Sequence, residues 1–130
     1  MSGHILIVDD NPINLKLASE VLLSGGYSIT EAADAEEAQQ ILAALVPDLI
    51  LMDIGLPGMD GLTLTRIIKA DRRLSQVPVV ALTAYALNDD DLKVTEAACD
   101  GYISIPIDTR NLIEKVSAAI ASSRAGPQPS

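Results

Sequence analysis

Aromatic and basic side chains are both scarce in this chain. It contains no Trp, no Phe and three Tyr, and its nine Lys and Arg face 18 Asp and Glu, which gives a formal net charge of −9. Proteins that bind nucleic acids neutralise phosphates with Lys and Arg and stack bases on aromatic rings. We therefore expect no direct binding to nucleic acid, and we expect protein or cation partners instead.

Cysteine and long apolar runs are scarce too. Cys99 is the single cysteine, so it has no partner for an internal disulfide, which suits the reducing cytoplasm. No run approaches the roughly 20 apolar residues that cross a bilayer, and the start Met1-Ser2-Gly3-His4 lacks the basic residues of a signal peptide. We expect a soluble, cytoplasmic protein that does not contact a membrane.

Short apolar runs alternate with segments of helical spacing along the chain. Strands are expected at 4–8, 27–32, 49–53, 77–83 and 102–104. Helices are expected after the capping residues Asn11, Asp34, Asn88 and Asp108, and from Gly61 to about Ala70. This alternation predicts a doubly wound α/β fold with parallel strands and right-handed crossovers, although periodicity leaves the strand order open.

The chain is long enough to bury one core, since it has 130 residues of which 48% are hydrophobic. We expect a single domain over residues 1–121. Residues 122–130 are expected to form a disordered tail or linker.

Three carboxylates follow two of the expected strands. Asp9 and Asp10 end the first strand, and Asp53 ends the third. If these strands are neighbours, the carboxylates meet at the edge of the sheet where α/β proteins bind ligands. Each like-charge pair at about 4 Å would cost roughly 4 kcal/mol at an effective dielectric near 20, and Mg²⁺ could compensate. Alternatively, Asp9 and Asp10 simply begin a loop.

Thr83 ends the fourth expected strand and adds a hydroxyl to the same edge. A carboxylate beside Mg²⁺ and a hydroxyl donor can act as a nucleophile toward a phosphoryl group and form an aspartyl phosphate. For Thr83 alone, the preference of threonine for strands is an alternative explanation.

Four stretches together resemble the receiver domain of two-component response regulators, over roughly residues 4–120. They are Ile5-Leu-Ile-Val-Asp-Asp-Asn-Pro12, Leu51-Met-Asp-Ile-Gly-Leu-Pro-Gly-Met-Asp-Gly61, Pro78-Val-Val-Ala-Leu-Thr-Ala84 and Gly101-Tyr-Ile-Ser-Ile-Pro106. The most similar types are single-domain regulators like DivK and receivers attached to hybrid histidine kinases. The resemblance implies a flavodoxin-like sheet of order 2-1-3-4-5 with five helices.

The resemblance also implies a role for each residue of the site. Asp53 would accept the phosphoryl group and ligate the metal. Asp10 would ligate Mg²⁺ directly, Asp9 would hold a metal-bound water, and Gly55 would supply a backbone carbonyl. An aspartate-based phosphatase is a competing class, but such enzymes usually carry a second acid two residues after the nucleophile, where this chain has Gly55.

The same resemblance implies a switch and its partners. Thr83 would bond the phosphoryl group, and Tyr102 would move inward as Thr83 shifts. The donor would be a histidine kinase or a phosphotransfer protein, and the altered surface would bind a downstream protein target. The face of the fourth helix, fifth strand and last helix could form a symmetric dimer, so a monomer or a weak dimer is expected. The chain would be no enzyme beyond assisting its own phosphorylation and dephosphorylation.

One position departs from the family pattern. Receivers normally carry a lysine before the proline that is Pro106 here, and this chain has Ile105. The lysine would make a charge-assisted contact of about 1.5–3 kcal/mol to the acceptor and then to the phosphoryl oxygen. Either the domain still receives phosphate, with weaker coupling between phosphorylation and its output face, or it is a phosphorylation-independent interaction module.

Overall fold

The computed structural model describes residues 3–53, 61–83, 100–104 and 109–124. Its strands are β1 (His4–Val8), β2 (Ser28–Ala32), β3 (Leu49–Asp53), β4 (Val79–Thr83) and β5 (Gly101–Ser104), and its helices are α1 (Pro12–Ser24), α2 (Ala35–Ala44), α3 (Gly61–Ala70) and α5 (Thr109–Arg124). The helix expected after Asn88 lies outside the described residues. Within them, no helix is both long and apolar enough to span a bilayer.

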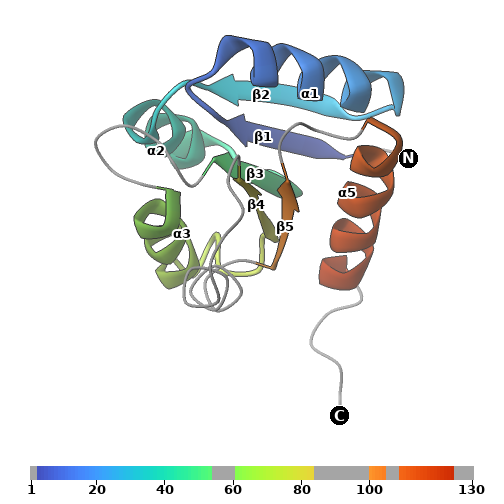
Figure 1. Cartoon of the computed structure of the whole chain (residues 1–130). Coiled ribbons are helices and arrows are strands. Elements are labelled where there is room, and N and C mark those ends of the chain that lie inside the picture. Colours follow the sequence, from blue (N-terminus) through green and yellow to red (C-terminus); the bar gives the residue numbers. More distant parts are fainter. Residues whose placement is uncertain (1–2, 54–60, 84–99, 105–108, 125–130) are drawn as a thin grey trace.

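The five strands form one parallel sheet in the order β2-β1-β3-β4-β5 (Figure 1). This order agrees with the flavodoxin-like order that the family resemblance implied. The register aligns Val8 of β1 with Met52 of β3, and Asp53 of β3 with Leu82 of β4. The C-terminal ends of the three central strands therefore lie together at one edge of the sheet.

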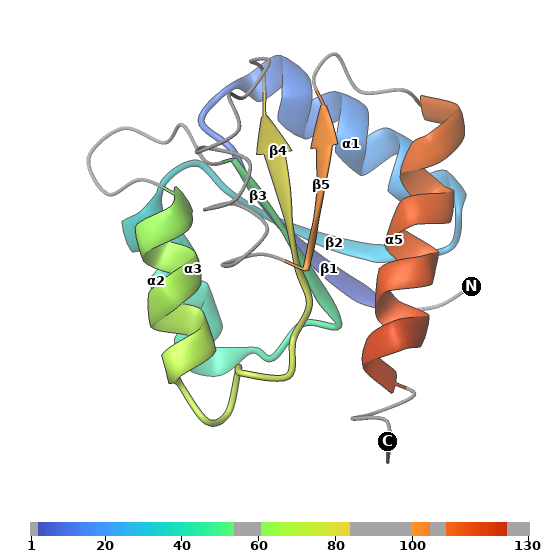
Figure 2. The same ribbon diagram turned by 60° about the horizontal axis from the view of Figure 1, so that its bottom comes forward.

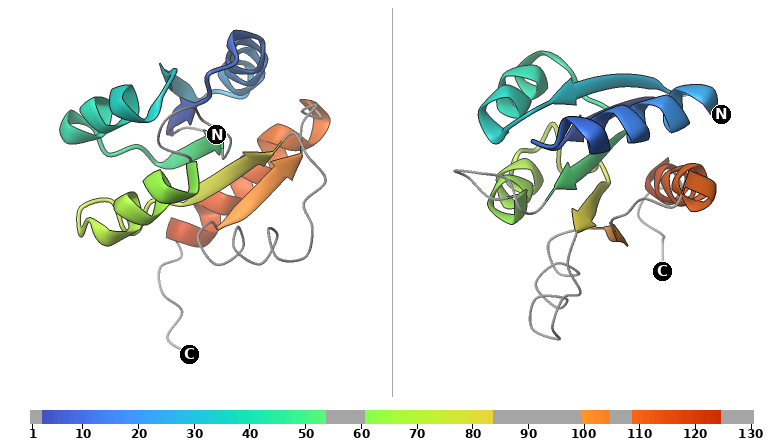
Figure 3. Two further views of the ribbon diagram at one scale, coloured as in Figure 1. Left: turned by 60° about the vertical axis from the view of Figure 1, so that its left-hand side comes forward. Right: turned by 45° about the horizontal axis from the view of Figure 1, so that its top comes forward.

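Helices cover both faces of the sheet, as the continuous apolar strands predict. Leu6 and Val8 of β1 belong to a core shared with α2 and α3, whereas Ile5 and Ile7 belong to a second core shared with α1 and α5. Figures 2 and 3 show α2 and α3 on one side of the strands and α1 and α5 on the other. Strands β1 and β3 are consequently buried on both faces, which fixes the positions of their C-terminal ends.

The ends of α1 follow from local chemistry. Its N-cap is Asn11, whose side-chain oxygen accepts hydrogen bonds from the backbone N–H groups of Ile13 (2.9 Å) and Asn14 (3.3 Å). Pro12 occupies the first helical turn, where its missing N–H costs nothing. The helix stops before Gly25, and Gly26 takes a φ of 93° that disfavours other residues. The cap at Asn11 confirms the sequence prediction for the start of this helix.

Four element boundaries differ from the sequence prediction. Strand β2 begins at Ser28 and not at Tyr27, and β5 begins at Gly101 and not at Tyr102. Strand β4 begins at Val79 and not at residue 77, because Pro78 has no N–H and the N–H of Val77 bonds back to the carbonyl of Leu74 (2.9 Å). Helix α5 continues to Arg124, so residues 122–124 are helical and do not belong to the disordered tail that we expected from residue 122. The first helix-breaking residues of this region are Gly126 and Pro127.

Candidate functional site

Three carboxylates gather at the C-terminal edge of the sheet. Asp9 and Asp10 directly follow β1, and Asp53 is the last residue of β3, the neighbour of β1 in the sheet. One carboxylate oxygen from each lies within 4.8 Å of the others. The sheet order that makes β1 and β3 neighbours thus brings together the three acids that the sequence placed at strand ends.

Asp9 is the most unusual member of this cluster, because its side chain is fully buried. Its Oδ1 accepts a hydrogen bond from the backbone N–H of Asn11 (2.9 Å), and its own N–H donates to the carbonyl of Ala32 (3.0 Å). Its Oδ2 has no hydrogen-bond partner among the described residues. A buried carboxylate oxygen without a donor is costly unless it is paired or coordinates a metal.

Asn11 connects the acidic cluster to α1. Its side chain caps the helix while its backbone N–H holds Asp9, so one residue fixes both the start of α1 and the orientation of the buried carboxylate. Sequence reasoning identified Asn11 only as a cap. The signal for its second contact was the spacing, because Asp side chains often bond the backbone two residues on.

The donor set of the cluster fits a hard divalent cation. Asp9 is buried, Asp53 is partly buried and Asp10 is exposed, so the site has a protein-facing side and a solvent-facing side. Mg²⁺ prefers carboxylate oxygen and usually keeps several waters. The partnerless Oδ2 of Asp9 is the observation that supports a cation here, because a cation would stabilise that oxygen and reduce the repulsion among three acids.

Strand register places two of the other predicted site residues, Thr83 and Tyr102. Thr83 is the last residue of β4 and pairs with Ser104 of β5, and Tyr102 pairs with Ala81. Thr83 therefore lies one residue beyond the partner of Asp53, at the edge where the acids meet. Gly55 and Ile105 lie outside the described residues. The roles of all four in metal binding, phosphoryl binding and switching stay predictions.

The Asp9→Asn variant should be more stable than the wild type in metal-free buffer, by about 1–3 kcal/mol, because it removes a buried charge with one unpaired oxygen. Chemical denaturation with a chelator present measures this difference. Added millimolar Mg²⁺ should stabilise the wild type and have less effect on the variant. Glu114→Gln, a change at an exposed acid of α5, should shift stability by no more than about 0.5 kcal/mol. A variant less stable than the wild type without metal would contradict the claim that the buried Asp9 carboxylate destabilises the metal-free fold.

Comparison with known proteins finds similarity over most of the chain. A family model described as the response regulator receiver domain matches residues 5–117. The polar-differentiation response regulator DivK of Brucella ovis is 37% identical over 116 residues, covering 89% of this chain and 94% of that relative.

Solved structures give the same picture. A putative response regulator from Chloroflexus aurantiacus superposes with a TM-score of 0.84 and 32% identity, covering 93% of this chain and 99% of the other. The signal receiver domain of a signal transduction histidine kinase from Syntrophus aciditrophicus has a TM-score of 0.86 and 29% identity, with 98% and 97% covered. The similarity thus extends over nearly the whole length of both structures.

Proposed function

Because the chain belongs to the response regulator receiver domain family of two-component systems, we propose that it is a phosphoacceptor switch in which Asp53 receives the phosphoryl group. The observation that supports this best is the convergence of Asp9, Asp10 and Asp53 within 4.8 Å at the C-terminal edge of the sheet. A histidine kinase or a phosphotransfer protein would be the donor, as for receivers in general, and the reaction would take place in the cytoplasm.

The proposed transfer is a displacement at phosphorus. A carboxylate oxygen of Asp53 forms a bond to phosphorus while the bond from phosphorus to the donor's imidazole nitrogen breaks, and that nitrogen keeps the electron pair. The product is an acyl phosphate on Asp53. Asp10 and Asp9, with the carbonyl of Gly55, would hold Mg²⁺, which when bound neutralises charge on the carboxylates and the phosphoryl oxygens. Thr83 would donate its hydroxyl hydrogen to a phosphoryl oxygen.

Phosphorylation would act as a switch through local charge. It replaces one carboxylate by a group with more negative charge and additional acceptor oxygens, which can bias a two-state element nearby. Thr83 and Tyr102 stand on the adjacent strands β4 and β5 and would transmit the change to the surface that binds a downstream protein. Beyond assisting its own phosphorylation and dephosphorylation, the chain would turn over no substrate.

Ile105 supports a second candidate function. Without the usual lysine, the domain could bind its partner irrespective of phosphorylation. We favour residual phosphotransfer with weakened coupling, because the acidic cluster and Thr83 are retained. Equal partner affinities of the wild type and an Asp53→Ala variant, with donor and Mg²⁺ present, would instead favour the phosphorylation-independent module.

The proposed function is tested by incubating the wild-type chain with phosphoramidate, a small donor with a phosphorus–nitrogen bond. Intact-mass spectrometry should detect one added phosphoryl group with Mg²⁺ and none when a chelator removes the metal, because the acids alone repel the anionic donor. Circular dichroism confirms that the metal-free chain stays folded. Equal modification with and without metal would contradict the proposed site.

A further inference from the structure

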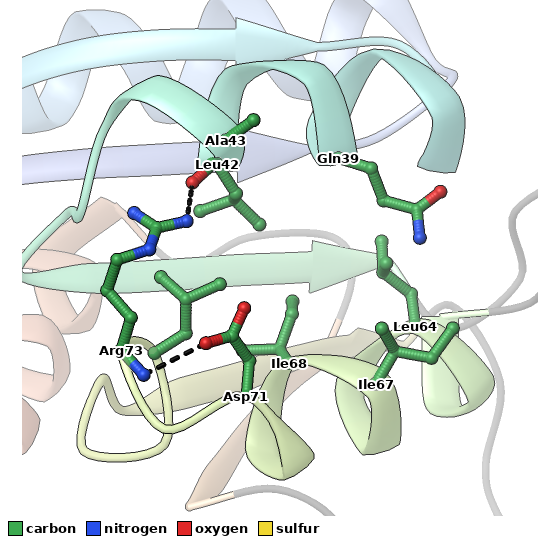
Figure 4. Close-up of a pocket in the computed structure, with 9 residues that line it drawn as sticks. Gln39, Leu42, Ala43, Leu64, Ile67, Ile68, Asp71 and Arg73 are labelled. Atoms are coloured by element: carbon green, nitrogen blue, oxygen red, sulfur yellow. Dashed lines mark hydrogen bonds between the residues drawn. The ribbon is translucent and has the colours of Figure 1, made fainter.

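A second feature lies away from the acidic cluster, in a pocket of about 280 Å³ between α2 and α3 (Figure 4). Its floor consists of four side chains that also belong to the core, namely Leu42, Leu64, Ile68 and Leu74. Each of these is at most 4% exposed. Side chains of the hydrophobic core therefore form the floor of the pocket, although they expose almost none of their own surface.

The mouth of this pocket carries an exposed apolar side chain. Ile67 of α3 lines the pocket and is 43% exposed, although its helix neighbours Leu64 and Ile68 are buried. Contact with one partner side chain would cover Ile67 and fill the space above Leu42. The volume is just below the roughly 300–1,000 Å³ typical of sites for drug-sized molecules, so the pocket suits one or two protein side chains better.

The segment that runs from α3 into the following turn has a charge opposite to that of the chain as a whole. The segment 66–73 holds four of the nine basic residues and one of the 18 acidic residues. Arg66, Arg72 and Arg73 are exposed. Lys69 is already engaged, because its Nζ donates to Asp100 (2.7 Å) and to the carbonyl of Val77 (2.8 Å). Three guanidinium groups of this segment are thus exposed, and among them that of Arg73 lines the pocket.

Arg73 is held at one end of the pocket. Its guanidinium donates to the carbonyl of Leu42 in α2, and its backbone N–H donates to Oδ1 of Asp71 (2.9 Å). Figure 4 shows the guanidinium beside the end of α2 and the amide of Gln39 at the other end of the pocket. Asp71, the one carboxylate among the described residues that line the pocket, thus accepts a hydrogen bond within its own turn. The two ends of the apolar floor are marked by polar groups that can donate hydrogen bonds.

We propose that the pocket between α2 and α3 is a docking site for an acidic segment of a partner protein, with a Leu or Ile side chain inserted above Leu42 and Ile68. Electrostatic complementarity favours this occupant, because an acidic segment is attracted to the arginines of 66–73 and repelled by most of a chain that carries −9. Apolar insertion would supply affinity, and the arginines would supply specificity and orientation.

The docking site is separate from the acidic cluster. Arg73 and Leu74 lie in the turn that precedes β4, whereas Asp53 ends β3. Among the described residues, none lines the pocket and also belongs to the cluster of three acids. Docking is therefore expected to be equally strong in the wild type and in an Asp53→Asn variant.

The test uses a synthetic helical peptide with Leu on one face and Glu on the other, titrated into the ¹⁵N-labelled chain and followed by NMR. Amide shifts should concentrate in α2, α3 and the turn that carries Arg73.

Ile67→Ser should weaken binding by about tenfold through lost apolar contact. Arg73→Glu should weaken it by about fivefold, because an exposed charge is reversed. Matched controls Ile13→Ser and Lys115→Glu, at exposed positions of α1 and α5, should stay within about twofold of the wild type.

Control ligands distinguish this occupant from others. A peptide with Lys in place of Glu, a peptide with Ser in place of Leu, and a short DNA duplex should each bind at least about tenfold more weakly than the acidic peptide. Stronger binding of the duplex would show a phosphate-binding surface and overturn the proposal. Absent shifts at millimolar peptide, self-association through this face, or unchanged affinity in both pocket variants, with their folds verified by circular dichroism, would also overturn it.

Discussion

The Asp53→Asn variant should receive no phosphoryl group from phosphoramidate with Mg²⁺, under conditions in which the wild type is modified. An amide oxygen is a far weaker nucleophile than a carboxylate, and no acyl phosphate forms from the amide. The fold should persist, because Asn has nearly the shape of Asp and removes one charge from a cluster of three. The effect is expected to be complete loss rather than a reduced rate, measured as the phosphorylated fraction by intact-mass spectrometry.

The control for Asp53→Asn is a variant that removes a carboxylate far from the acidic cluster in the sequence. Glu114→Gln removes one exposed carboxylate of α5 and should leave the phosphorylated fraction unchanged. Phosphorylation of the Asp53→Asn chain at the wild-type level would show that another group accepts the phosphoryl group. The convergence of the three acids would then have to be explained by metal binding alone.

The Ile105→Lys variant should accept the phosphoryl group about tenfold to a hundredfold faster than the wild type. A charge-assisted contact from a lysine to the transferred oxygens is typically worth about 1.5–3 kcal/mol, and each 1.4 kcal/mol in transition-state stabilisation changes a rate tenfold. The initial rate of modification by phosphoramidate measures the gain. Partner binding should also depend more strongly on phosphorylation once the coupling contact is restored.

Ile105→Met is the appropriate control for this gain, because Met is unbranched and similar in length to Lys but carries no charge. It should react at the wild-type rate. Equal rates for the wild type, Ile105→Lys and Ile105→Met would show that this position does not limit the switch. Equal acceleration in both variants would ascribe the effect to side-chain shape and not to charge.

Local chemistry explains why much of the fold was predictable from the sequence. The run Leu49 to Met52 is apolar without interruption and ends in Asp53, so both the strand and the position of its carboxylate follow from the pattern. The cap at Asn11 and the stop at Gly25 likewise depend on neighbouring residues. The strand order did not follow from periodicity, because it depends on contacts between distant segments. It was implied by the resemblance to receivers.

Features that depend on packing could not be predicted in this way. Sequence spacing identified Leu42, Leu64 and Ile68 as core-facing residues of two helices, but the opening between those helices depends on how they pack. Positive charge near the end of α3 is also favoured by the helix dipole, so the sequence alone gives it no further meaning. Its position beside an apolar pocket, through Arg73, became apparent only in three dimensions.

The same distinction holds for the acidic site. The sequence predicted that Asp9, Asp10 and Asp53 would meet if β1 and β3 were neighbours, and they do. It could not show that Asp9 is fully buried with one oxygen lacking a partner among the described residues. That observation depends on how α1 and β2 enclose the end of β1, and it is the stronger argument for a cation.

The central claim, that Asp53 is the phosphoacceptor, is tested most directly by locating the phosphoryl group on the wild-type chain. After reaction with phosphoramidate and Mg²⁺, reduction with borohydride converts an aspartyl phosphate to homoserine, which peptide mass spectrometry can assign to one residue. We predict homoserine at position 53 and at no other aspartate. Homoserine at a different position, or none at any position in a folded chain with Mg²⁺ present, would contradict the claim.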